Sequence, residues 1–194
     1  LDVCDPEAAA RLRRYEYREG LVDDAGSLAG RYELAGFIDH TRRLIAVADR
    51  FSPQIKLFTA AHELGHLELH PGLHHHRERP LAGIAEPSIP LDPVEREANH
   101  FAGCFLVPRK QLILAFRACF GDEPLRLTDN VAYELLPAAF NMLLTADPRS
   151  LSFERAVAQT SHYGGRRFEP LCTLFRVSPT TMAIRLRQVG LALV

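Results

Sequence analysis

The chain has 194 residues, of which 47% are hydrophobic and 24% charged. This composition predicts one globular domain, or one domain with a small appendage, and excludes a disordered or fibrous chain. The formal net charge of -1 gives no general attraction to nucleic acid or to an anionic membrane. No apolar run approaches the roughly 18 residues of a membrane span, and the first residues lack the apolar core of a signal peptide. We therefore expect no membrane association. Four widely spaced cysteines, Cys4, Cys104, Cys119 and Cys172, are typical of reduced thiols in a cytoplasmic protein.

The first fifty residues predict a helix followed by a hairpin. Asp5 and Pro6 provide a cap and a first turn for a helix over residues 6–18, whereas residues 21–30 are weakly helical or a loop. Two short aromatic and β-branched segments, 32–40 and 42–50, flank a polar turn and predict a β-hairpin. An exposed edge of this hairpin could hold an extended peptide by main-chain hydrogen bonds. Alternatively, the hairpin only covers the core.

The next segment, Ser52 to His70, predicts a long buried helix. Ser52 is a good N-cap, Pro53 suits the first helical position, and a Pro-Gly pair ends the run. Residues 62–66 read HELGH, so that His62 and His66 lie four apart on one face and can reach a single ion. Glu63, one position along, can act on a water at that ion as a general base. The alternative is an ordinary surface helix that contains this short pattern by chance.

A proline-rich segment, residues 71–93, predicts a loop, in which His74, His75 and His76 are read as solvated side chains. A second helix then begins at Asp92-Pro93 and runs to Val107. Glu95 is the favoured third ligand, and Asn99, four residues later on the same face, could hydrogen-bond a ligand from behind. Two alternatives remain open. In one, Glu95 completes a capping box with Asp92, and in the other, Glu97 is the carboxylate ligand.

Together, FTAAHELGHLELHP and EREANHFAGCFLVP resemble the ImmA/IrrE family of zinc metallopeptidases over about residues 30 to 110. The resemblance implies His62, His66 and Glu95 as metal ligands and Glu63 as the catalytic base. It also implies a gluzincin-like fold and a repressor protein as substrate. FLV stands where the more usual sequence is LLM, which exchanges hydrophobic residues for hydrophobic ones.

The remainder of the chain reads as helical. It predicts a helix closed by Gly121, a helix from about 131 to 144 that Pro137 kinks or divides, and a tail typical of a helix-turn-helix with Ser178 as the second cap. Several tail side chains could face phosphates: Thr180, Thr181, Arg185 and Arg187, with Arg166, Arg167 and Arg176 nearby. The favoured alternative is packing, because the net charge is near zero.

We therefore predict an α+β, mainly helical zincin- or gluzincin-like metallopeptidase, with a small sheet beside the HExxH helix. Residues 1–125 are expected to form the peptidase domain and residues 126–194 a helical segment ending in the helix-turn-helix-like tail. The predicted activity is hydrolysis of a cognate repressor by a Zn2+ enzyme, although Mn2+ also suits two histidines and a glutamate. His162 and Tyr163 are candidate oxyanion stabilisers. The rival function is a DNA- or protein-binding regulator with a structural metal, which needs a fourth ligand such as His70 or His100.

Overall fold

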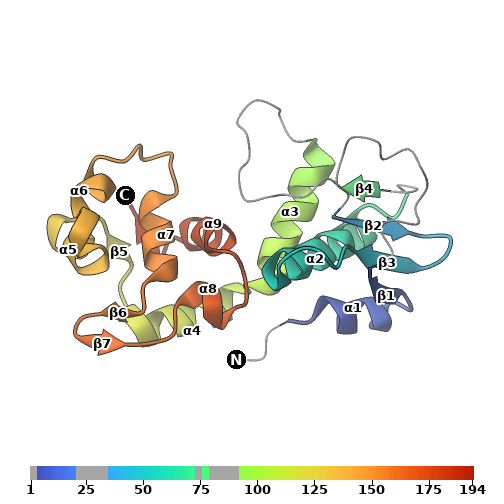
Figure 1. The fold of residues 1–194 in the computed structure, drawn as a ribbon, viewed down its shortest axis with the longest axis horizontal. Helices are drawn as coiled ribbons and strands as arrows, with labels where there is room; N and C mark the ends of the chain where they lie inside the picture. Colours follow the sequence, from blue (N-terminus) through green and yellow to red (C-terminus); the bar gives the residue numbers. More distant parts are fainter. Residues whose placement is uncertain (1–3, 21–34, 73–75, 79–91) are drawn as a thin grey trace. The chain divides into compact units, whose positions relative to one another are not determined.

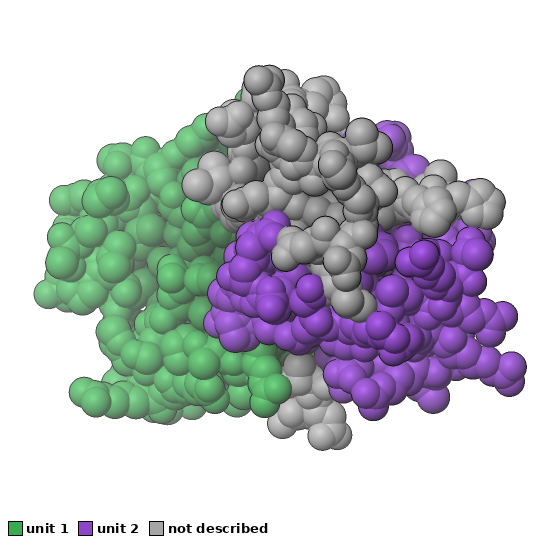
Figure 2. Space-filling view, turned by 45° about the vertical axis from the view of Figure 1, so that its right-hand side comes forward, with its two compact units in different colours: residues 1–2, 107–194 green, residues 3–106 purple. Residues whose placement is uncertain are grey.

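The computed structural model describes residues 4–20, 35–72, 76–78 and 92–194, with residues 76–78 described by their backbone alone. These residues belong to two compact units that meet in the chain between Leu106 and Val107. Figure 2 colours the two units purple and green. The predicted boundary at 125/126 remains a prediction, as does the structure of residues 21–30, most of the 71–93 loop, His74 and His75, which lie outside the described residues.

In its described residues, the unit that ends at Leu106 combines a four-stranded sheet with three helices (Figure 1). Its elements are α1 (Pro6–Leu12), β1 (Glu16–Glu19), β2 (Gly36–Asp39), β3 (Leu44–Val47), α2 (Pro53–Leu69), β4 (His76–Glu78) and α3 (Pro93–Leu106). The strand order is β1-β3-β2-β4, with β1 parallel to β3 and the other neighbours antiparallel. The fold of the described residues is thus α+β, as predicted.

The predicted helix over residues 6–18 is too long. Asp5 caps α1 as expected, but Arg14 has a positive φ of 64° and the chain continues as β1. Tyr15 and Tyr17 pack against a core cluster of Ala10, Ile38 and Ile45. This tertiary contact outweighs the local helical preference of the Tyr-Glu-Tyr-Arg segment.

The predicted hairpin is confirmed, but its edges are not exposed. β2 and β3 pair from Gly36↔Val47 to Asp39↔Leu44, and Asp39 Oδ1 accepts hydrogen bonds from the turn amides of Thr41 and Arg42 at 2.9 Å each. However, β1 covers the other side of β3 and β4 covers the other side of β2. β4 also replaces part of the predicted loop, so the outer strands of this sheet are β1 and β4.

The predicted buried helix is confirmed as α2. Ser52 Oγ accepts from the Ile55 amide, Pro53 occupies the first turn, and the helix ends at Leu69. Eight consecutive residues, Thr59 to His66, are buried, so the helix is enclosed on every side over two turns. The second helix is also confirmed, since α3 begins at Pro93 and Asp92 Oδ1 accepts from the Val94 amide at 3.0 Å.

The unit that begins at Val107 is helical with short strand pairs. Its elements are α4 (Arg109–Phe120), β5 (Leu125–Arg126), α5 (Asp129–Leu135), a 3-10 helix (Pro137–Ala139), α6 (Phe140–Leu144), α7 (Ser152–Gln159), β6 (His162–Tyr163), β7 (Arg166–Arg167), α8 (Leu171–Leu174), α9 (Pro179–Val189) and β8 (Ala192–Leu193). Gly121 ends α4, and Pro137 divides the α5–α6 region, as predicted. The pairing of β5 with β8, close to the end of the chain, was not predicted.

The tail contains two helical pieces around a turn, and Ser178 Oγ caps α9 by accepting from the Thr181 amide at 3.1 Å. The first piece, α8, has four residues only. That Arg185 and Arg187 could face phosphates stays a prediction, although both guanidinium groups bind within the unit. Arg185 donates twice to the Val107 carbonyl at 3.2 Å, and Arg187 donates to the buried Glu154 carboxylate at 2.6 Å.

Arg166 is engaged in a similar way. Its guanidinium donates to the carbonyls of Ala118 and Cys119 near the end of α4. These bonds satisfy carbonyl groups that a helix end leaves without helical partners. These contacts favour the packing alternative for the three arginines.

Candidate metal centre

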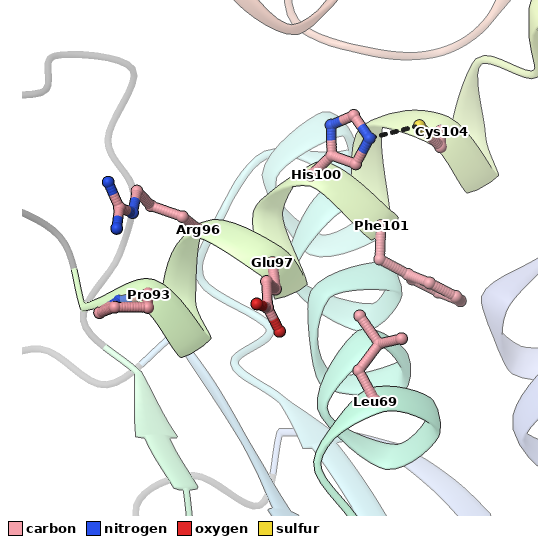
Figure 3. Close-up of a pocket in the computed structure, with 7 residues that line it drawn as sticks. All are labelled: Leu69, Pro93, Arg96, Glu97, His100, Phe101 and Cys104. Atoms are coloured by element: carbon pink, nitrogen blue, oxygen red, sulfur yellow. Dashed lines mark hydrogen bonds between the residues drawn. The ribbon is translucent and has the colours of Figure 1, made fainter.

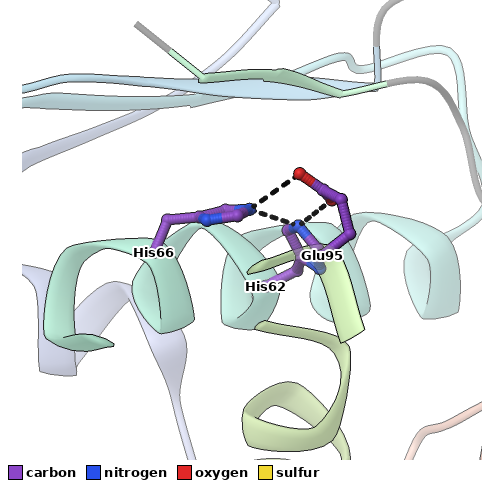
Figure 4. Close-up of side chains that lie close together, drawn as sticks. All are labelled: His62, His66 and Glu95. Atoms are coloured by element: carbon purple, nitrogen blue, oxygen red, sulfur yellow. Dashed lines mark hydrogen bonds and ion pairs between the residues drawn. The ribbon is translucent and has the colours of Figure 1, made fainter. Parts of the chain in front are cut away.

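Two histidines of α2 and one glutamate of α3 converge in the unit that ends at Leu106 (Figure 4). His62, His66 and Glu95 each offer one ligand atom, and these atoms all lie within 4.8 Å of one another. Glu95 Oε2 is 3.3 Å from His62 Nε2, and Glu95 Oε1 is 3.7 Å from His66 Nε2. The two Nε2 atoms are 2.8 Å apart. Among the described residues this is the one group of three or more such side chains with this geometry.

The convergence depends on a close approach of α2 and α3. Gly65 lies against Ala98: a Cβ added at Gly65 would stand 3.1 Å from both the Cα and the carbonyl oxygen of Ala98. Ala98 itself is fully buried. Small residues on both helices thus allow the backbones to come together, and α3 presents Glu95 to the two imidazoles.

The histidine rings are held from behind by further side chains. His62 Nδ1 lies 3.0 Å from Asn99 Oδ1, one turn beyond Glu95 on α3. An amide oxygen only accepts, so Nδ1 carries the proton and Nε2 keeps its lone pair for an ion. His66 Nδ1 is in turn 3.2 Å from His70 Nδ1. Asn99 thus hydrogen-bonds the His62 ring on the side away from Glu95 and His66, and its role behind a metal ligand stays a prediction.

Glu63 is fully buried at the side of α2 that meets the sheet. A Cβ added at Gly36 in β2 would stand 3.4 Å from Glu63 Oε1 and only 2.5 Å from the Thr59 methyl group. Glycine is therefore required here for β2 to lie against α2. A carboxylate buried this deeply costs free energy unless charges or donors compensate for it.

The donor set fits a divalent ion. Two neutral imidazole nitrogens and one carboxylate are ligands that zinc takes, and tetrahedral ligand atoms at zinc distances lie about 3.3 Å apart. The separations between Glu95 and the two rings are close to this value, whereas the Nε2–Nε2 separation is shorter. Facing lone pairs repel at this separation, so an ion between the two ring nitrogens would suit the site.

The other carboxylate and histidine candidates lie elsewhere. Glu97 is exposed and its Oε2 is 3.0 Å from His70 Nε2. His100 contacts Cys104 Sγ at 3.5 Å and lines a largely apolar pocket between the end of α2 and the outer side of α3 (Figure 3). Neither His70 nor His100 joins the three-residue group.

His162 and Tyr163 belong to the second unit, where they form β6 of a two-residue hairpin around two glycines of positive φ. Burial raises the pKa of Tyr163, and the negative charge of Glu134 adds to this effect. The phenol therefore stays protonated at neutral pH and keeps its O–H to donate. The oxyanion role of these two residues stays a prediction.

Residues 26–142 match the model of a peptidase family described as the IrrE N-terminal-like domain. The match contains the HELGH helix and Glu95, and it covers more than half of the chain. The chain belongs to this family. Membership in the IrrE-like family points to a metallopeptidase of the ImmA/IrrE type with a metal cofactor, typically zinc, and a protein substrate.

No curated protein matches the chain. Within the described part of this IrrE-like chain, no helix is both long enough and apolar enough to cross a bilayer. The family match also extends past the boundary between the two compact units, into α6.

Proposed function

We propose that the chain is a zinc-dependent endopeptidase whose metal is held by His62, His66 and Glu95. The observation that carries this proposal is the convergence of these three side chains from two helices, with ligand atoms within 4.8 Å of one another. Three protein ligands leave a coordination position for water or substrate, which is the arrangement of catalytic rather than structural zinc sites. Mn2+ is the alternative ion for the same ligands.

The residues around the ligands have separate tasks in this proposal. When bound by these residues, zinc would supply Lewis acidity and lower the pKa of a water molecule. Glu63, adjacent in sequence to His62, accepts the proton of the attacking water and delivers it to the amine of the leaving peptide fragment. Asn99 accepts from His62 Nδ1 and so keeps that ring in the ligand orientation.

The substrate in this proposal is an extended segment of a protein. Among the described strands β4 is an outer one, and its neighbour β2 passes next to Glu63. An extended peptide can add to an outer strand by main-chain hydrogen bonds. Resemblance to the ImmA/IrrE family favours a repressor or another regulator in a mobile-element or stress-response circuit. The rival proposal, a regulator with a structural metal, lacks support from a fourth ligand among the described residues.

Replacement of Glu63 by glutamine tests the proposal. The parent and the Glu63→Gln protein are each loaded with zinc and incubated with a candidate repressor, and the products are mapped by mass spectrometry. We expect the parent to cut within a flexible segment, and the variant to lose about 10²- to 10⁴-fold in rate because the general base is gone. Both proteins should contain equal zinc, since the ligands are unchanged. Equal cleavage rates with equal zinc would refute the role of Glu63.

A further inference from the structure

His70 lies one helical turn beyond His66, and its side chain is 9% exposed. Residues four apart share a helix face, so the His70 ring stands behind the His66 ring. Their Nδ1 atoms are 3.2 Å apart and their ring centroids 5.3 Å apart. His66 therefore turns one nitrogen toward Glu95 and His62 and the other toward His70.

The far side of the His70 ring meets Glu97. His70 Nε2 is 3.0 Å from Glu97 Oε2. In Figure 3, Glu97 lies on α3 with its carboxylate directed toward the end of α2, near Leu69. Three side chains from two helices thus form one hydrogen-bonded row, Glu97–His70–His66, that ends at the metal centre.

The direction of the hydrogen bonds in this row follows from the chemistry of its ends. An ionised carboxylate only accepts, so His70 must donate to Glu97 from Nε2. A neutral His70 then has a lone pair on Nδ1, which accepts from His66 Nδ1–H. His66 is left with its lone pair on Nε2, the nitrogen that faces Glu95.

We propose that Glu97 and His70 are positioning residues that fix the tautomer of His66 in the form that can bind a metal. For His62, one amide, Asn99, performs the same task. The inference deepens the proposed function, because it rests on His66 Nε2 as a ligand atom. From the sequence, Glu97 is an alternative metal ligand. In this proposal it does not bind the metal and instead orients His70.

Ring-nitrogen NMR of the metal-free protein labelled with 15N-histidine tests the tautomer directly. We expect the parent to show a proton on His66 Nδ1. In His70→Leu the acceptor is lost, and the form with a proton on Nε2 should gain population. A parent that carries the proton on His66 Nε2 would overturn the proposal.

Zinc affinity, measured by competition with a chelator, provides the second readout. His70→Leu should weaken zinc binding about 10- to 100-fold, as is common when the partner of a ligand is removed. His70→Asn should restore most of the affinity, because Asn Oδ1 can stand where imidazole Nδ1 stood and can accept from His66. The matched control is His100→Leu, which removes a histidine of α3 outside the row and should bind zinc like the parent. Parent-like affinity in His70→Leu would refute the relay.

Glu97 is tested by a double-mutant cycle. Its side chain is 63% exposed, and water can partly replace it, so we expect Glu97→Ala to weaken zinc binding only a few-fold. In the His70→Asn background the same change should have no effect, because the link between Glu97 and His66 is already cut. Equal effects in both backgrounds would exclude a relay through His70. Neither readout uses hydrolysis, so they remain decisive even if the Glu63 experiment fails.

Discussion

Glu95 illustrates how one side chain can satisfy two sequence patterns. By sequence, it is either a metal ligand or the distal member of a capping box that begins at Asp92. In the structure, Asp92 Oδ1 accepts from the Val94 amide, and the Glu95 carboxylate lies 3.3 Å and 3.7 Å from the two imidazoles. The geometry therefore favours the ligand reading.

Replacement of Glu95 by alanine should remove the metal from the purified protein. The two imidazoles that remain form a weak site, since the charged ligand is lost. Elemental analysis after dialysis provides the measurement. Glu68→Ala is the control: Glu68 lies on α2 in an exposed ion pair with Arg13, outside the three-residue group. If Glu95→Ala contained as much zinc as the parent, Glu95 would not be a ligand and the capping-box interpretation would stand.

The histidines of α2 also differ in what surrounds them. The His62 ring contacts the side-chain amide of Asn99, whereas the His66 ring contacts the His70 ring, which in turn contacts the Glu97 carboxylate. Glu97 is exposed, as most glutamates are, and exposure alone indicates no function. Its contact with His70 gives it a position in the network behind the metal centre.

At the scale of elements, the crossing of α2 and α3 decides whether a metal site exists. Gly65 lies inside the HELGH run, between the two histidines, and a Cβ added there would meet the Ala98 backbone and the Phe101 ring. Alanine favours a helix by about 1 kcal/mol over glycine. Extra volume in a packed interface, however, commonly costs about 1–3 kcal/mol. The packing term should therefore prevail.

Gly65→Ala should destabilise the first unit and weaken zinc binding, because α3 must shift and carry Glu95 with it. The unfolding free energy by urea titration and the zinc dissociation constant by chelator competition measure the two effects. Gly72→Ala serves as the control, since a Cβ at Gly72 meets nothing within 4 Å. It should change stability by less than about 0.5 kcal/mol. A Gly65→Ala protein more stable than the parent would show that helix propensity decides instead.

The second unit shows the same dependence on contacts distant in sequence. Arg187 of α9 donates to the carboxylate of Glu154, which is 1% exposed on α7, and also to carbonyls of the loop that precedes α7. A buried carboxylate requires a partner of this kind, because removal of one member of a buried pair leaves an uncompensated charge. Arg187 of the tail thus makes its contacts within the unit.

At the scale of the whole molecule, metal binding should stabilise one unit and leave the other unchanged. The proposed ligands all lie in the unit that ends at Leu106. A ligand that binds only the folded state adds about 2.7 kcal/mol at a free concentration of 100 Kd. The expected gain is therefore confined to α2, α3 and the sheet that packs on them.

Hydrogen exchange followed by mass spectrometry, with and without zinc, tests this expectation. Peptides from α2 and α3 should exchange more slowly with zinc, and peptides from α7 and α9 should be unaffected. Glu63→Gln should respond like the parent, and Glu95→Ala should not respond. Protection that spreads equally over both units would contradict a metal site confined to the first one.

Local signals in the sequence were sufficient for several parts of the molecule. Ser52 and Pro53 begin α2, the four-residue spacing of His62 and His66 places them on one helix face, and Pro137 divides the helix that contains it. These features depend on caps, on the fixed period of the helix and on the ring of proline, all of which act within a few residues. The placement of the two histidines on one face of α2 could therefore be predicted.

Other features were decided by the tertiary structure alone. The Tyr-Glu-Tyr-Arg segment becomes β1 because its tyrosines pack on Ile38 and Ile45, and β4 arises in a predicted loop because it pairs with β2. The approach of Gly65 to Ala98 and the contact of His70 with Glu97 join two helices that are separated in the sequence. Such contacts depend on how the elements pack in space. The residues next to each partner in the sequence therefore do not identify the distant residue that it contacts.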